Sequence, residues 1–369
     1  MRMKKIILIA AVAIAAAACS KTFDTNLATD ENPISFGSWN EVLTKARATG
    51  NDNTAFADGE KFDVFGVKTV GSNTTTVFDG VDVEATVSGT EVTWDYEHHR
   101  FWDSNASQYT FYAVMPNDKL ASSNAETGAF TSNDITFSDP TAFSNDIMVA
   151  DKKVVAGTGS QAPYSYSSPV ALQFNHIASS VDLFVKKDVQ LKDATVTVTD
   201  LSLVNIKNVG SFAVTGYDNS TNVPAISWTA KAGTLGTSNV YPVLTAGSVE
   251  APDQTTYTNH NGAATTMTAG ELFSGYVFMP QDLDADQKVR LTYTINVDGD
   301  INTYTDVEVN FNTFQTTDTD NNSGTDIDSW NLKTHYTYYI TIGANVITFT
   351  ANVKTWENTV SAGYHYILN

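Results

Sequence analysis

The sequence of 369 residues predicts an all-β protein. Thr, Asn, Asp, Ser, Gly, Tyr and Val are frequent, while the helix formers Leu, Lys, Arg and Glu are scarce, and this balance favours strands and turns. Short apolar or alternating segments follow one another with turn residues between them, which is typical of β-sandwiches. No long amphipathic helical pattern interrupts these segments.

The predicted strands start at Lys61 and recur to Lys354. Residues 289–297 alternate most regularly, because every second side chain is apolar and would lie on one face of a sheet. The other predicted strands cover residues 92–96, 109–115, 135–137, 147–150, 170–176, 181–186, 194–204, 210–215, 272–279, 304–311, 335–342 and 346–354. Polar loops are expected at residues 215–222 and 246–270.

The N-terminus has the pattern of an export signal. Basic residues precede an apolar run at residues 6–18, which as a helix would cover only ~20 Å of a hydrocarbon core of ~30 Å. Residues 16–19 resemble a bacterial lipobox, with Ala16 in place of the usual Leu, and this implies that Cys19 is acylated and begins the mature protein. A signal peptide with an unmodified Cys19 is the alternative.

The composition excludes several classes of protein. Removal of residues 1–18 takes away three positive charges and changes the formal net charge from −20 to −23, so binding to nucleic acid or to anionic lipid is not expected. Cys19 is the only cysteine, so the chain can form no intramolecular disulfide and depends on its core for stability. Residues 19–32 are polar and are interpreted as a tether between the lipid and the fold.

Four local patterns follow one another along the chain. They are Leu172–Ala178 followed by Val181, Leu183 and Val185; Phe278–Gln281 followed by the strand from Val289; Trp330–Lys333 running into Tyr336–Ile340; and Ile347–Trp356. In this order, and together with the lipobox, these patterns resemble the fimbrillin family, whose members build type V pili of Gram-negative bacteria.

The resemblance implies two transthyretin-like β-sandwich domains in tandem, which we place at residues 33–207 and 208–369. It also implies assembly by strand exchange, in which a protease cuts after an Arg and so removes the lipid together with the first strand. Here the cut would fall between Arg47 and Ala48. The removed pro-strand, residues 33–47, would carry the apolar side chains of Ile34, Phe36 and Trp39.

The function implied by the resemblance is that of a stalk or tip subunit of a surface fimbria, made as an outer-membrane lipoprotein and without catalytic activity. Its partners would be other fimbrial subunits, the processing protease and, in adhesion, a host glycan or protein. Residues 347–353 are interpreted as the last strand of their own domain. The candidate strand for donation to a neighbour is the tail with Tyr364, Tyr366 and Leu368.

Other candidate sites have simpler interpretations. His176 lies among apolar residues and is expected to be a hydrogen-bonded core histidine, and His98 and His99 are expected in a turn. The acidic residues 318–326 lack the Gly and Glu spacing of a calcium loop, and Asp282, Asp284 and Asp286 are expected to face water.

No catalytic motif, metal site or cofactor site is therefore predicted. Two alternatives to a fimbrial subunit stay open. One is a permanently anchored lipoprotein that binds glycan or a host ligand through exposed aromatic rings. The other is a hydrolase of glycans, for which the sequence offers only carboxylates that cannot be placed.

Overall fold

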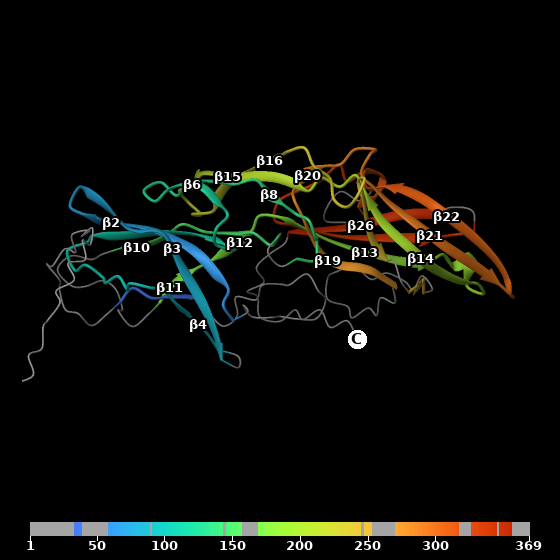
Figure 1. Ribbon diagram of the computed structural model, residues 1–369, viewed down its shortest axis with the longest axis horizontal. Coiled ribbons are helices and arrows are strands. Elements are labelled where there is room, and N and C mark those ends of the chain that lie inside the picture. The colour runs from blue at the N-terminus through green and yellow to red at the C-terminus, as the bar shows by residue number, and fades with distance from the viewer. Residues whose placement is uncertain are drawn as a thin grey trace, which may run out of the picture.

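The computed structural model describes residues 33–38, 58–88, 91–142, 145–156, 169–244, 247–252, 270–316, 326–344 and 347–355. Within these ranges the regular elements are β-strands and two short 3-10 turns, η2 (Val189–Leu191) and η3 (Phe311–Thr313), so the all-β prediction is confirmed. None of the described residues forms a helix that is long and apolar enough to cross a membrane. The molecule is elongated, with the first strands at one end and the last strands at the other (Figure 1).

Two antiparallel sheets form the N-terminal half. The larger has the order β12-β9-β5-β2-β3-β4, with β10 also beside β5, and the smaller has the order β16-β15-β7-β6, with β8 also beside β15. The strands of the larger sheet are β2 (Lys61–Val70), β3 (Asn73–Ser88), β4 (Glu91–Asp95), β5 (Gln108–Met115), β9 (Met148–Ala150), β10 (Lys153–Ala156) and β12 (Phe174–His176). Those of the smaller are β6 (Leu120–Asn124), β7 (Ala129–Ser132), β8 (Ile135–Thr136), β15 (Val209–Tyr217) and β16 (Pro224–Ala230).

Two further sheets form the C-terminal half. One has the order β19-β13-β25-β26-β23, and the other has the order β17-β14-β21-β22 with β18 also beside β14. The strands of the first are β13 (Ser179–Lys187), β19 (Gly270–Phe278), β23 (Gln315–Thr316), β25 (Thr334–Ile342) and β26 (Ile347–Thr355). Those of the second are β14 (Thr195–Val204), β17 (Val240–Leu244), β18 (Val249–Glu250), β21 (Lys288–Val297) and β22 (Asp300–Asn310).

Two small sheets complete the fold. β1 (Phe36–Ser38) pairs in parallel with β11 (Val170–Leu172), and β20 (Gln281–Asp282) pairs with β24 (Ser329–Trp330). The buried side chain of Gln281 holds the chain at this point through three hydrogen bonds. It accepts one from the main-chain N–H of Lys207 and donates to the carbonyl oxygens of Lys207 and Met279.

Alternation of side chains along the strands divides the buried residues into three clusters. In β2, Phe62 and Val64 point to one side of the larger N-terminal sheet, and Phe65 and Val67, at alternate positions, point to the other. The first side is covered by β1, β11 and the loops near them, and the second side is covered by the smaller sheet. The third cluster lies between the two C-terminal sheets.

The chain crosses between the two halves more than once. β13 and β14 pair with C-terminal strands, whereas the following strands β15 and β16 return to the N-terminal half. The division into domains at residues 33–207 and 208–369 stays a prediction, and these strand pairings cross it in both directions.

Most predicted strands are present, and the largest difference is β3, which the sequence analysis did not identify. Its first residues, Asn73 to Thr76, are polar and exposed, and only Phe78, Val83 and Ala85 of the strand are buried. β3 therefore pairs along β2 as one arm of a hairpin without burying a whole face.

The alternating segment from Val289 is β21, and β26 pairs with β25 in its own half, as predicted.

A buried carboxyl lies where β2, β3 and the turn after β5 meet. Asp63 is 8% exposed and is opposite Asp82 in the pairing of β2 with β3. Burial is the main reason why the pKa of Asp63 is raised to about 7; the Asp82 carboxyl adds to this effect, and the N–H of Asp118, which donates to Oδ2 of Asp63 at 3.2 Å, opposes it. Lys61 forms its ion pairs with Asp82 and Glu84.

We therefore predict that Asp63→Asn stabilises the protein at pH 8. Since the folded-state pKa lies above the ordinary value of about 4, stability contributed by the Asp63 proton is complete at low pH and is lost as the pH rises from about 4 to about 7. The variant should exceed the wild type in free energy of unfolding by about 1–2 kcal/mol at pH 8, allowing for solvent near the cluster, and should match it near pH 4.

Urea unfolding at both pH values measures this difference. Asp79→Asn, a change to an exposed carboxylate of β3, is the control and should show no such dependence on pH. A constant difference between Asp63→Asn and the wild type from pH 4 to pH 8 would contradict the assignment.

Candidate functional site

A short segment near the N-terminus completes the N-terminal core. Ile34 is fully buried and Phe36 is 3% exposed, although only residues 33–38 of this region are described. The two side chains are two positions apart, so in an extended chain they point to the same side. Both belong to the cluster on the side of the larger sheet that faces away from the smaller sheet.

The main chain of this segment is hydrogen-bonded on two sides. On one side β1 pairs in parallel with β11, in the register Phe36 to Val170, and the N–H of Val170 donates to the carbonyl of Ser35 at 2.7 Å. On the other side the N–H of Ile34 donates to the carbonyl of Arg100 at 2.7 Å. The segment therefore lies in a groove between β11 and the loop of residues 96–101, which we call the 96–101 loop.

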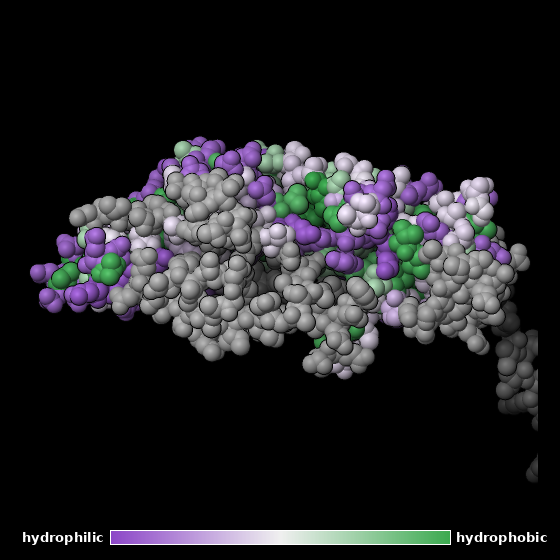
Figure 2. Space-filling view, turned by 180° about the vertical axis from the view of Figure 1, so that it is seen from behind, coloured by the Kyte–Doolittle hydropathy of each residue, from purple (hydrophilic) through white to green (hydrophobic). Residues whose placement is uncertain are grey.

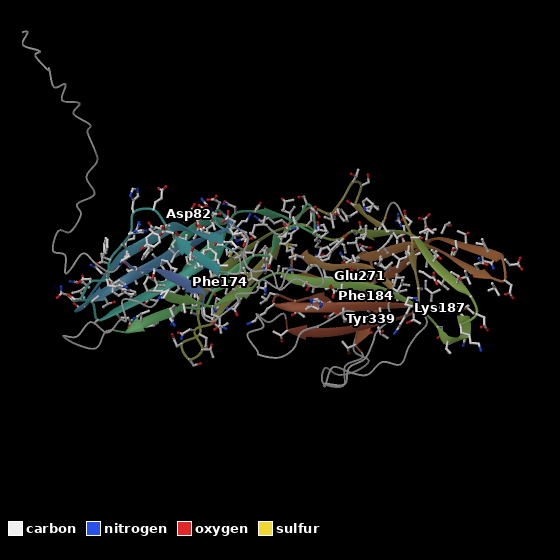
Figure 3. All side chains as sticks on the ribbon, turned by 90° about the horizontal axis from the view of Figure 1, so that it is seen from below. Asp82, Phe174, Phe184, Lys187, Glu271 and Tyr339 are labelled. Atoms are coloured by element: carbon white, nitrogen blue, oxygen red, sulfur yellow. The ribbon has the colours of Figure 1, made fainter. Side chains whose placement is uncertain are left out.

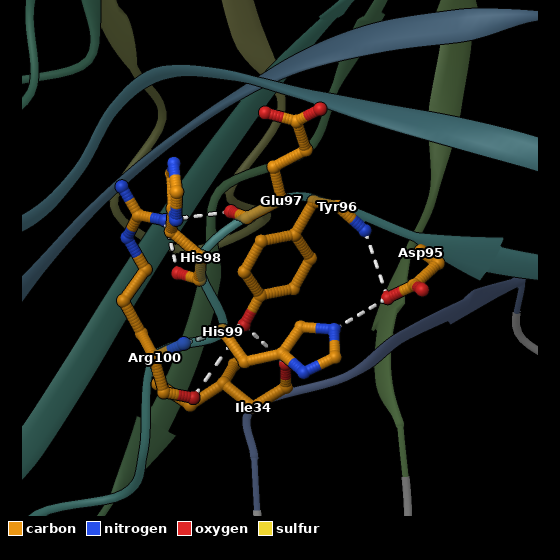
Figure 4. Close-up of polar contacts among 7 residues, drawn as sticks. All are labelled: Ile34, Asp95, Tyr96, Glu97, His98, His99 and Arg100. Carbon is orange, nitrogen blue, oxygen red and sulfur yellow. Dashed lines mark hydrogen bonds and ion pairs between the residues drawn. The ribbon is translucent and has the colours of Figure 1, made fainter. Parts of the chain in front are cut away.

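The Tyr96 hydroxyl is the centre of the 96–101 loop (Figure 4). It donates to the carbonyl of Ile34 at 2.6 Å and accepts from the N–H of Arg100 at 3.2 Å. Burial raises the pKa of the Tyr96 phenol, so the hydroxyl keeps its proton and acts as a donor. Because its acceptor is a main-chain carbonyl, this contact does not depend on which side chain occupies position 34.

The Arg100 and His99 side chains fix the shape of the same loop. The Arg100 guanidinium donates to the carbonyl of Val77 on β3 at 3.1 Å and to that of His98 at 2.7 Å, and it lies 5.2 Å from the centroid of the Phe78 ring. The ring of His99 is 2.7 Å from Oδ1 of Asp95 (Figure 4), and this hydrogen bond is the main reason why the pKa of Asp95 is lowered.

Four aromatic rings surround Phe36. The centroids of Phe78, Tyr96 and Phe111 lie 5.3, 5.8 and 5.8 Å from that of Phe36, and the centroid of Phe62 lies 6.2 Å away. Three of the four contacts are edge-to-face, an arrangement that aromatic rings favour beyond the burial of their area. These four rings form the pocket that we call the Phe36 pocket.

The geometry lets this site bind an extended segment of polypeptide. It offers hydrogen bonds to the main chain on both sides and buries every second side chain, as in recognition by strand addition. Without the segment, the apolar side of the larger sheet and the edge of β11 would be open to water or to another strand.

The structure places only some of the predicted site residues. Ile34 and Phe36 come together in one core as described above. Outside the described residues lie the predicted signal peptide, the tether and the following candidate positions: Cys19, Trp39, Arg47, Ala48, Tyr364, Tyr366 and Leu368. Most of the acidic loop at 318–326 also lies outside them, whereas Asp282, Asp284 and Asp286 are exposed as predicted.

The predictions for the histidines are confirmed. His176 is fully buried on β12, and its Nδ1 is 2.6 Å from Oδ1 of Asp146, so it is a hydrogen-bonded core residue. His98 lies in the turn after β4 with a positive φ of 58°. Among the described residues, no three His, Cys, Asp or Glu side chains are grouped as metal ligands would be.

One arrangement in the C-terminal half has the residue types of a catalytic triad. His335 on β25 is 3.1 Å from Oγ of Ser180 and 2.9 Å from Oδ2 of Asp182, both on β13. Ser180 is only 1% exposed, however, and Oδ1 of Asp182 accepts the N–H of Gly275 on β19 at 2.7 Å. These contacts link three neighbouring strands, and the buried Ser180 is out of reach of a substrate.

The same face of this sheet carries a stacked aromatic pair. Phe184 and Tyr339 lie side by side in the C-terminal half (Figure 3), with ring centroids 5.6 Å apart. Nζ of Lys186 is 5.4 Å from the Tyr339 centroid. Tyr339 is only 4% exposed, so this pair offers little ring surface to a ligand.

Sequence reasoning missed Tyr96, Arg100 and Pro169 as parts of the groove. The sequence places Tyr96 at the end of a predicted strand and Arg100 directly after the expected turn at His98 and His99, and nothing local to either residue indicates a partner more than 60 positions away. The one available signal was Gly37 beside Phe36: a Cβ on Gly37 would lie 2.8 Å from Cβ of Pro169, which explains a glycine at this place in a strand.

Comparisons with known proteins agree with this architecture. No curated protein sequence matches the chain significantly. Among solved structures, a fimbrial protein of Bacteroides vulgatus is similar over 89% of this chain and all of its own, with 19% identity and a TM-score of 0.55, which supports a shared fold.

Two further structures are described as proposed cell adhesion proteins. That of Bacteroides uniformis covers 85% of this chain and 99% of its own, with 16% identity and a TM-score of 0.45. That of Parabacteroides distasonis covers 84% and 97%, with 11% identity and a TM-score of 0.45. The fimbrillin-like family profile matches residues 44–356, which is most of the sequence. The chain therefore belongs to the fimbrillin-like family.

Proposed function

We propose that this protein is a structural subunit of a surface fimbria that assembles by exchange of its N-terminal strand. It would be exported as an outer-membrane lipoprotein anchored through Cys19, cleaved between Arg47 and Ala48, and joined to other subunits as stalk or tip, with a role in adhesion. Its fold would be that of two tandem transthyretin-like sandwiches, consistent with the two pairs of facing sheets.

The observation that carries this proposal is the burial of Ile34 and Phe36 by a segment only a few residues long. Burial of two such side chains contributes at most ~3–6 kcal/mol, and the main-chain bonds of the groove add to this. A strand from a neighbouring subunit that fills the same positions would restore these contacts. The tail with Tyr364, Tyr366 and Leu368 is one candidate for such a strand.

The described arginines favour Arg47 as the processed residue. The Arg100 guanidinium is held by main-chain carbonyls, and Arg290 on β21 forms an ion pair with Glu308 at 2.8 Å. A protease needs an extended and accessible substrate segment. Arg290 lies within a paired strand, and the main chain of Arg100 is hydrogen-bonded to Ile34 and Tyr96, so neither offers one.

The alternative, a permanently anchored protein that binds glycan or a host ligand, has less support. The face seen in Figure 2 is largely hydrophilic where residues are described, with hydrophobic residues in small patches. Among the described residues, the large hydrophobic side chains that are exposed include one aromatic ring, that of Tyr304. A platform for sugars would need several such rings together.

We predict that Arg47→Ala abolishes assembly. Without the cut, the N-terminal segment stays in the groove by effective concentration, and no neighbour can compete with it. Electron microscopy should show no filaments on cells that carry this variant, and the protein should remain in the membrane fraction at full mature length.

The matched control is Lys45→Ala, which removes a neighbouring positive charge and should leave filaments unchanged. In the wild type, N-terminal sequencing of polymer sheared from cells should begin at Ala48. Filaments formed by Arg47→Ala, or polymer that begins at Cys19, would refute processing at Arg47.

We also predict that Tyr96→Phe loosens the N-terminal segment. The change removes the hydroxyl that bonds Ile34 and Arg100 and keeps the ring beside Phe36. The loss of a buried hydrogen bond should lower the free energy of unfolding by about 1–2 kcal/mol in urea, and the N–H of Ile34 should exchange with solvent faster.

Tyr304→Phe is the control, since the Tyr304 ring is 37% exposed on β22 and stacks on Tyr293 without a described hydrogen bond of its hydroxyl. This second variant should unfold like the wild type. Equal stability of Tyr96→Phe and Tyr304→Phe would show that the Tyr96 hydroxyl does not retain the segment.

A further inference from the structure

Three positions of the bound segment make side-chain-dependent contacts with the groove: two buried side chains and one glycine. Ile34 fills the first position, Phe36 fills the Phe36 pocket, and Gly37 passes Pro169. The contacts to the main chain would be the same for any extended segment, so selection between occupants must come from these three positions.

The Phe36 pocket is suited to phenylalanine and not to tyrosine. Among the described residues, the four rings around Phe36 carry one polar atom, the Tyr96 hydroxyl, and that atom already bonds Ile34 and Arg100. A tyrosine in this pocket would bring a second hydroxyl among these four rings, within a core cluster that is mainly apolar. A buried hydroxyl without a partner is costly.

Pro169 sets the requirement at the next position. A Cβ at position 37 would lie 2.8 Å from Cβ of Pro169, a separation at which one of the two must move. Pro169 directly precedes β11, and the pairing of β11 with β1 fixes the position of the segment relative to Pro169. A side chain at this position would therefore push the strand away from β11.

The tail of this chain does not meet these requirements in any register. With Tyr364 or Tyr366 in the Phe36 pocket, a tyrosine hydroxyl is buried and His365 or Ile367 faces Pro169. With Leu368 in the pocket, Asn369 faces Pro169, and with Ile367 there, Leu368 does, so a Cβ again meets Pro169. Gly363 is the only glycine of residues 360–369, and the register that brings it beside Pro169 places Ala362 in the pocket and leaves most of it empty.

Phe-Gly occurs at one other place in the sequence, Phe65-Gly66. That pair lies within β2, between its neighbours β3 and β5, and Asp63 stands where the first apolar residue would be needed. No other segment of this chain thus carries the pattern of residues 34–37.

We propose that the groove selects a strand with the pattern apolar–any–Phe–Gly, and that its occupant in the assembled fimbria is a strand of a different protein chain rather than the tail of an identical subunit. This inference rests on the proposed strand exchange. It assigns the protein to heterotypic junctions and names the sequence by which its partner is recognised.

Peptide exchange tests this inference. The mature chain is cleaved with an arginine-specific protease and incubated with labelled synthetic peptides, and bound peptide is measured by native mass spectrometry. The peptides are residues 31–40, the same peptide with Phe36→Tyr, the same with Gly37→Val, and the tail peptide of residues 360–369. The two substituted peptides and the tail peptide should require about tenfold to hundredfold higher concentration than the parent for equal occupancy.

Equal occupancy by the parent, the Phe36→Tyr peptide and the tail peptide would overturn the inference and leave strand exchange intact. If no peptide enters, the parent included, strand exchange itself fails.

Selection by the pocket is then decided in the uncleaved chain, where Phe36→Tyr should melt at a lower temperature than Phe36→Leu. Phe184→Tyr, on the outer face of β13, is the control and should melt like the wild type. A Phe36→Tyr variant as stable as Phe36→Leu or more so would refute the pocket's preference.

Discussion

The N-terminal half depends on one ring, that of Phe36, which fills the space between four others. The larger sheet has two apolar sides, and the smaller sheet covers only one of them. The other side is closed by β1, β11 and the loops near them, and the few residues of the N-terminal segment complete this cover. A core completed by so short a segment is stable while the segment is present and is ready to accept another strand when it is absent. The proposed function follows from this imbalance.

The path of the chain makes the two halves mechanically dependent on each other. β13 and β14 enter the C-terminal half before β15 and β16 return, and the third core cluster of the molecule is separate from the two N-terminal ones. At the junction the indole N–H of Trp228 donates to the carbonyl of Ile177 at 2.6 Å, and Val277 and Met279 of the C-terminal half pack into the N-terminal core. A force along the molecule is therefore carried by several strands and an apolar contact, and not by a single linker.

The sequence was most informative where function depends on local pattern. The resemblance to the fimbrillin family, together with the short apolar pattern of the segment, pointed to Ile34 and Phe36, and the regular alternation from Val289 predicted β21 from the residues alone. β3 was not predicted, because its first half is exposed and polar and shows no hydrophobic periodicity. The return of β15 to the N-terminal half and the bond from Tyr96 to Ile34 join residues distant in sequence, and such pairings leave no mark in any local window. The groove was thus predictable from its occupant and not from its walls.

Two kinds of contact hold the segment in the groove, and they would act differently in the proposed exchange. The hydrogen bonds with Val170, Arg100 and Tyr96 involve main-chain atoms of the segment, so they do not distinguish the chain's own segment from another. In an uncleaved chain the segment is tethered, and its effective concentration exceeds that of any free strand.

The proposed cleavage would remove this advantage without changing a contact in the groove. The outcome would then depend on side-chain fit at the Phe36 pocket and at Pro169, and a strand that fits better would replace the segment by mass action. Under this proposal, one peptide bond outside the groove would control assembly, while the groove itself would determine the partner.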